Sequence, residues 1–126
     1  MKQYIIVIVS VIAILLLNFY QISFLNDTKR YVLADLNDIE NALNRKDFEG
    51  ILTSINELEN TWRNIEKGWD IFGEHDDVKE INEHIARIKI YAKYNEESEL
   101  AMEIANLETI INHVVDSENL SFSNVL

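Results

Sequence analysis

The residues best suited to do chemistry lie together in one short segment, Glu74-His75-Asp76-Asp77. A histidine among carboxylates could hold a divalent cation or transfer protons in acid–base catalysis. A metal site needs three or more converging ligands, however, and one turn rarely supplies them. The segment therefore predicts a polar turn between two helices, in which Asp76 or Asp77 caps the second helix. His75 would then end the first helix and pack beside Trp69. A metal-dependent hydrolase centred on His75 is the least favoured alternative.

A second polar group follows on the next predicted helix, where residues three or four positions apart share a face. Glu80 and His84 are four apart, and His84 and Arg87 are three apart. A metal site here would need ligands from another helix, and His113 is the only histidine left. We therefore expect these side chains to form exposed salt bridges, which contribute little stability.

Trp62 and Trp69 lie seven residues apart on one helical seam. Tryptophans at this spacing belong to a helix core more often than to a ligand pocket or a partner groove. The chain has no Cys, no glycine-rich phosphate loop and no serine in a nucleophile elbow, so we expect neither an enzyme nor a bound cofactor or metal. The candidate structural or interaction positions are Trp62, Trp69, His75, Asp77 and Arg87.

The element that precedes these residues is strongly apolar. Residues 5–17 are interrupted only by Ser10, and a helix over residues 4–25 spans about 33 Å, enough to cross a bilayer. A cleaved signal peptide would also carry Lys2 before an apolar run, but no small-x-small cleavage site follows Leu17. We predict an uncleaved transmembrane signal anchor at residues 1–25 that contacts the lipid bilayer through residues 4–25.

The orientation of this anchor is not decided by charge. Lys2 precedes it and Lys29 and Arg30 follow it, so the positive-inside rule is nearly balanced. The short segment before the anchor favours ordinary signal-anchor insertion. We therefore expect a single-pass protein of the cell membrane whose C-terminal domain is extracytoplasmic.

The rest of the chain is acidic. The net charge is −11, and residues 1–26 contain one base and no acid, so the remainder carries 22 acids against 10 bases, or −12. A field of this sign repels nucleic acid and anionic lipid headgroups. We therefore expect no nucleic-acid partner. The charge does not decide whether the chain forms a homo-oligomer.

The acidic part, residues 26–126, is predicted to be a helical domain, because the chain has no Pro and only three Gly. Apolar spacings of three and four predict helices at about residues 26–44, 48–72, 77–94 and 96–115, followed by a tail at residues 116–126. The clearest heptad seam is on the second helix and comprises Phe48, Ile51, Ile55, Leu58, Trp62, Ile65, Trp69 and Phe72.

The turns between these helices are short, so neighbouring helices should be antiparallel. The expected fold is all-α, with an N-terminal transmembrane helix followed by a four-helix domain of two antiparallel helical hairpins. The anchor and the first domain helix should form one rod with a joint at Asn26-Asp27. The tail is expected to dock on the helices through its apolar residues Leu120, Phe122, Val125 and Leu126.

Several segments together resemble a bacterial family known only as domain of unknown function 4363. The resemblance is carried by Lys46-Asp47-Phe48 opening a helix with both tryptophans, by His75 before Asp77-Val78-Lys79-Glu80-Ile81, by Ile85-Ala86-Arg87-Ile88 with Tyr91, and by the closing residues 120–126. It covers nearly the whole chain, although Lys79 replaces the usual acid and His84 is atypical. It implies a small membrane-anchored protein with a multi-pass membrane protein as partner, and no known activity or functional residues.

These features favour a non-enzymatic, membrane-anchored helical module that binds another membrane protein, as a partner-binding or accessory subunit. The alternative is an extracytoplasmic helical domain that senses a ligand or a cation. The absence of a second membrane span and of an output domain speaks against this alternative.

Overall fold

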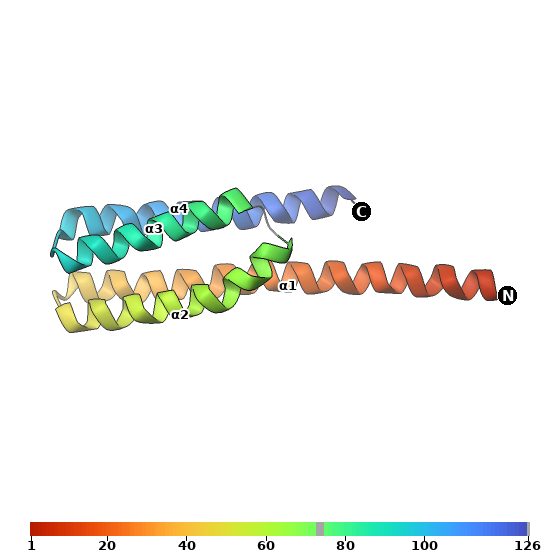
Figure 1. The fold of residues 1–126 in the computed structure, drawn as a ribbon, viewed down its shortest axis with the longest axis horizontal. Helices are drawn as coiled ribbons and strands as arrows, with labels where there is room; N and C mark the ends of the chain where they lie inside the picture. The colour runs from red at the N-terminus through yellow and green to blue at the C-terminus, as the bar shows by residue number, and fades with distance from the viewer. Residues whose placement is uncertain (73–74, 126) are drawn as a thin grey trace.

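The computed structural model describes the backbone of residues 1–72 and 75–125, and their side chains except those of Phe72 and residues 119–125. The helices are α1 (Lys2–Asn44), α2 (Phe48–Phe72), α3 (His75–Lys93) and α4 (Glu97–Val125). Helices α1 and α2 form one antiparallel hairpin, α3 and α4 form a second, and the hairpins lie side by side (Figure 1). The predicted all-α fold of two hairpins is confirmed.

Helix α1 is unbroken along its whole length, so the apolar segment and the first bundle helix form one rod without a joint at Asn26-Asp27. The N-terminal part of the rod projects alone beyond the other helices (Figure 1). The bundle begins before the boundary predicted after residue 25, because Gln21 and Leu25 are already buried. These two side chains lie one turn apart, on a face that continues through the buried Thr28.

The projecting part of α1 is long and apolar enough to cross a membrane. Its most apolar 18 residues have a mean hydropathy of 2.6, and none of them is buried inside the protein. Length and composition of this kind are shared by signal sequences and by core helices of soluble proteins. The core helix of a soluble protein is mostly buried, whereas no residue of this segment is buried.

Each helix packs on two neighbours: α1 on α2 and α4, and α3 on α2 and α4. The apolar spacing predicted this core, and the α2 seam is buried or partly buried from Ile51 to Trp69. Phe48 is the exception, because its side chain is 43% exposed. It lies in the first turn of α2, at the end of the bundle, so its predicted place in the seam is wrong. The side chain of Phe72 lies outside the described residues. The apolar residues with no exposed surface among those described are Val32, Leu36, Ile39, Leu58, Ile81, Ile88 and Leu107.

The two hairpins repeat one backbone design. Each hairpin turn contains a non-glycine residue with positive φ, Lys46 at 57° and Asn95 at 55°, which are 49 residues apart. In both turns the next residue donates its N–H over 2.9 Å to the carbonyl five positions earlier, a Schellman-type helix end. The same offset pairs buried core positions: Leu36 with Ile85, Ile39 with Ile88, Ile55 with Ile104, and Leu58 with Leu107.

The boundaries of α3 and α4 differ from those predicted. Helix α3 begins at His75, so Asp77 lies inside its first turn and is not the cap. Helix α4 continues to Val125, so the predicted end near residue 115 and the non-periodic tail are wrong. No Pro or Gly follows Gly73, and the backbone of α4 therefore has no reason to stop. The apolar side chains of the tail lie outside the described residues, and their docking stays a prediction.

Candidate functional site

A buried ionic cluster joins α3 to α4. The Glu103 carboxylate on α4 accepts hydrogen bonds from Nδ1 of His84 and, over 3.0 Å, from Nε of Arg87. An ionised carboxylate can only accept, so His84 presents an N–H at Nδ1. His84 is 9% exposed and Glu103 is 6% exposed. The predicted exposed salt bridge on α3 is therefore wrong: the partner comes from α4, and Glu80 stays on the surface outside this cluster.

The charges of this cluster balance one another. Burial by itself would raise the pKa of Glu103, but the hydrogen bonds and charges of Arg87 and His84 outweigh it and hold that pKa below its ordinary value. The hydrogen bond to Glu103 also raises the pKa of Arg87, which stays charged. His84 and Arg87 therefore both donate to the same carboxylate, that of Glu103. This arrangement ties helices α3 and α4 together.

The polar segment at residues 74–77, which the sequence offered as a candidate metal site, does not form such a site among the described residues. Glu74 lies outside them. His75 is exposed and begins α3, so it does not end the preceding helix as predicted, and its packing beside Trp69 stays a prediction. Asp76 is exposed and Asp77 is half-buried, both in the first turn of α3, where the helix dipole favours negative charge.

Trp69 fixes the end of α2 to α1. Its Nε1 donates to Oγ1 of Thr28 over 3.1 Å, and the Thr28 hydroxyl donates to the carbonyl of Phe24 over 3.0 Å. The Phe24 and Trp69 ring centroids are 6.2 Å apart. Gly68 makes room for this contact, since a Cβ there would lie 2.5 Å from the Phe24 ring. Trp69 is therefore a core residue, as its spacing predicted, and it lines none of the hollows described below.

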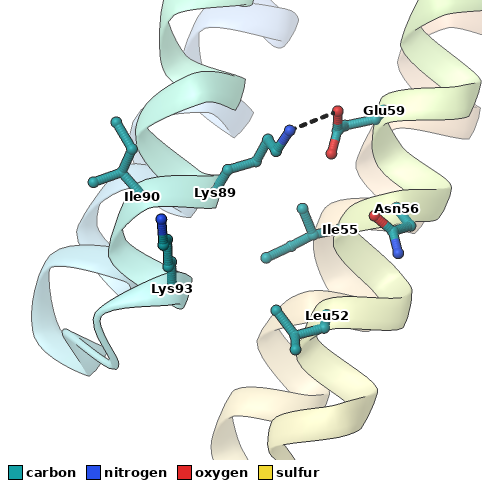
Figure 2. A pocket seen from close by; sticks show the side chains of 7 residues that line it. All are labelled: Leu52, Ile55, Asn56, Glu59, Lys89, Ile90 and Lys93. Carbon is teal, nitrogen blue, oxygen red and sulfur yellow. Dashed lines mark hydrogen bonds and ion pairs between the residues drawn. The ribbon is translucent and has the colours of Figure 1, made fainter.

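The most open seam of the bundle lies between α2 and α3, which pack on each other less extensively than the other neighbouring helices do. A hollow of about 400 Å³ occupies this seam (Figure 2). Its wall includes Leu52 and Ile90, which are 42% and 52% exposed, and the buried Ile55. Lys89 on α3 crosses to Glu59 on α2 with 3.2 Å between Nζ and Oε2 (Figure 2). The full lining is Leu52, Ile55, Asn56, Glu59, Lys89, Ile90 and Lys93.

A second hollow of about 260 Å³ continues the first along the same seam, since both are lined by Glu59 and Lys89. Here Nε1 of Trp62 donates to Asn82 over 2.7 Å, and the Asn82 amide donates to Glu66 over 3.0 Å. Trp62 is only 3% exposed, so it is a core residue that also lines the seam. We call the two hollows together the α2–α3 groove.

Three carboxylates converge on the α1–α2 hairpin. Oxygen atoms of Asp35, Asp38 and Glu57 lie within 4.8 Å of one another. Oδ2 of Asp35 is buried and has no hydrogen-bond partner. The 49-residue offset places Asp35 and Asp38 where the second hairpin has His84 and Arg87. On the first helix of each hairpin the two equivalent positions are thus polar, acidic in the first hairpin and basic in the second.

Sequence reasoning missed the α2–α3 groove, although the sequence contained a signal for it. Leu52 adjoins the seam residue Ile51, and Ile90 lies between Lys89 and Tyr91, so each apolar side chain falls beside the stripe of its helix. Apolar residues on an otherwise polar face indicate a surface that another molecule covers. The predicted candidates Trp62 and Arg87 lie on different seams, the first in the groove and the second against α4.

Comparison with known proteins places the chain in one family. A family model described as domain of unknown function (DUF4363) matches residues 19–125. The match includes the end of the apolar segment and the four bundle helices. No curated protein and no solved structure matches the chain.

Proposed function

We propose that this chain, which belongs to the DUF4363 family, is a non-enzymatic, membrane-anchored module that binds another membrane protein outside the cytoplasm. The projecting part of α1 supports the anchor, because its side chains from Tyr4 to Leu17 are exposed and, except for Ser10, apolar. Exposed surface of this kind is stable only in a lipid or protein environment. The unbroken rod then couples the anchor rigidly to the bundle.

The observation that carries the proposal is the pair of exposed apolar side chains, Leu52 and Ile90, on the wall of the α2–α3 groove. Helices α2 and α3 pack on each other less extensively than the other neighbouring helices do, and the space beside Ile55 stays open. An amphipathic helix is the kind of partner that fills such a seam, because its apolar face can be inserted between two parallel ridges. The partner segment we propose is therefore a helix of another membrane protein.

Charge further restricts this helix. Lys89 in the groove is already paired with Glu59, but Lys93 contacts only the ring of Tyr94 among its described interactions, 5.6 Å from Nζ to the ring centroid. An acidic side chain on the partner helix would pair with Lys93 in a domain that is acidic elsewhere. The partner is thus an apolar helix that carries a carboxylate at the position facing Lys93.

Co-purification from membranes in a mild detergent tests this function. The protein should bring down one membrane protein, and Leu52→Asn or Ile90→Asn should remove it. Met102→Asn is the matched control, because Met102 is 64% exposed but lies on α4 outside the groove. The identified partner should then bind the purified protein in nanodiscs with the same ranking of variants. A protein that is solitary in mild detergent, or equal retention by all variants, would count against the proposal.

Cation sensing is the second candidate, and the orphaned Oδ2 of Asp35 supports it. Three converging carboxylates are a donor set that Ca²⁺ or Mg²⁺ accepts. Calcium or magnesium should then raise the thermal midpoint of the wild type but not that of Asp38→Asn. An equal response by both, or none, would remove this candidate.

A further inference from the structure

The apolar segment of α1 and the bundle overlap along the rod. A bilayer core of about 30 Å takes about 20 helical residues, which places its outer boundary near Leu25 when the inner end lies near Tyr4. Gln21 and Leu25 are nevertheless buried by the bundle. The bundle therefore has no stalk between itself and the end of the apolar segment.

The end of α2 reaches this same level. Trp69 lies between Phe24 and Thr28, with its ring against the first and its Nε1 bonded to the second. Helices α1 and α2 are antiparallel, so each residue after Trp69 moves about 1.5 Å toward the anchor. Ile71 thus lies close to the level of Leu25, and its side chain is 75% exposed.

The end of α4 reaches the same level from the other hairpin. Lys29 Nζ lies 3.9 Å from Oδ1 of Asp116, which sets the register of the antiparallel helices α1 and α4. From Asp116 the backbone of α4 continues nine residues to Val125, and its last turns extend beyond the end of α2 (Figure 1). At 1.5 Å per residue these turns come level with residues 20–26. The sequence contains no charged residue after Glu118.

We infer that this end of the bundle, which we call the foot (Ile71 and the last turns of α4), rests at the boundary between the headgroup layer and the acyl chains of the bilayer. The inference relies on the proposed membrane anchoring. An exposed isoleucine at this level gains from contact with the acyl boundary. Asp70 and Asp76 are exposed on the neighbouring turns, which limits the depth of this contact and favours zwitterionic over anionic lipid.

The foot sets the height at which the α2–α3 groove meets its partner. Leu52 precedes Ile71 by 19 residues of one continuous helix, so it lies about 28 Å above the foot. A partner whose extramembrane parts are only short loops cannot reach this height. The partner helix must therefore belong to a part of the protein that projects well beyond the bilayer.

Spin labels at single cysteines test the foot, because the natural chain has no Cys. Ile71→Cys is compared with Ile90→Cys, an exposed isoleucine far from the foot, and with Leu16→Cys inside the apolar segment. Each variant is reconstituted in phosphatidylcholine vesicles at low protein density, and its helicity is checked by circular dichroism. The label's accessibility to oxygen and to a water-soluble nickel chelate is then measured.

The label at residue 71 should lie within about 10 Å of the acyl boundary, with oxygen favoured over nickel, while the label at residue 90 should be aqueous. Equal nickel access at residues 71 and 90, with residue 16 in hydrocarbon, would overturn the foot and leave the anchor intact. An aqueous label at residue 16 would overturn the anchoring and the foot together. Spin–spin broadening at residue 71 would show that a second copy covers it, which also overturns lipid contact.

Discussion

Trp69 and Thr28 are joined by a hydrogen bond of 3.1 Å that links the last turns of α2 to the rod that continues from the apolar segment. Thr28 has no exposed surface and Trp69 is 1% exposed, so neither side chain can form a hydrogen bond with water in place of this one. This bond, with the packing of Phe24, holds the bundle against the base of the rod. The position of every other surface relative to a membrane depends on it.

Thr28→Val should therefore destabilise the bundle. The substitution keeps the shape of the side chain but leaves the indole N–H of Trp69 buried without an acceptor, which costs about 1–3 kcal/mol. Thermal midpoints followed by circular dichroism in mild detergent measure the loss. Thr109→Val is the matched control, since its exposed hydroxyl makes the same type of bond to the carbonyl four residues earlier. Equal losses in both variants would show that the bond to Trp69 is not the cause.

Gly68→Ala should also destabilise the bundle, even though alanine is favoured over glycine in a helix by about 1 kcal/mol. The new Cβ would lie 2.5 Å from a Phe24 ring that is held against Trp69. At Gly50 a Cβ would instead meet the exposed Asp47 carboxylate, which accepts a hydrogen bond from the Gly50 N–H over 3.1 Å. Turning this side chain into solvent would lose that one exposed bond, a loss that the higher helix propensity of alanine offsets. The thermal midpoint should fall clearly further in Gly68→Ala than in Gly50→Ala, and a gain at Gly68 would contradict the packing described.

Glu103 should make the bundle sensitive to acid. Its pKa is lower in the folded protein than in the unfolded chain, so its ionised form stabilises the fold above the unfolded value of about 4.3. That stabilisation is lost as the pH falls through the lower, folded pKa. Glu103→Gln should lower the thermal midpoint at pH 7 and flatten its decline on acidification. Glu99→Gln, at an exposed acid one turn earlier, should follow the wild-type profile.

Glu108 should have the opposite effect. Partial burial and the nearby charge of Glu40 raise its pKa, so ionisation of Glu108 destabilises the fold above its unfolded pKa. Glu108→Gln should raise the thermal midpoint at pH 7, and the gain should disappear below about pH 4, where the wild-type carboxyl is protonated. Glu40→Gln should reproduce part of this gain. A lower midpoint for Glu108→Gln at pH 7 would contradict the assignment.

Local periodicity was enough to predict the helices and most of the core. The spacing of Ile51, Ile55, Leu58 and Trp62 is a property of α2 alone, and burial follows from it once a second helix packs there. The periodicity failed at the ends of helices. It extended the seam to Phe48, whose side chain is 43% exposed at the end of the bundle. It also stopped α4 where the apolar stripe became irregular, although the backbone had no reason to stop.

The polar sites could not be predicted because each joins two helices. Glu103 is one of several acids on α4, and nothing in its local sequence distinguishes it from Glu99. Only the packing of α3 on α4 brings it to His84 and Arg87. The carboxylates of Asp35 and Glu57 likewise meet across the first hairpin. The α2–α3 groove depends on how loosely two helices pack, which a single-helix pattern does not contain.

Site-directed photocrosslinking in intact membranes tests directly whether the α2–α3 groove binds another membrane protein. A photoreactive amino acid replaces Leu52 or Ile90 in the α2–α3 groove, or Met102 on the exposed face of α4. We expect crosslinks from both groove positions to the projecting part of one membrane protein and none from Met102. Equal crosslinking from all three positions, or none from the groove in a correctly anchored protein, would contradict this expectation.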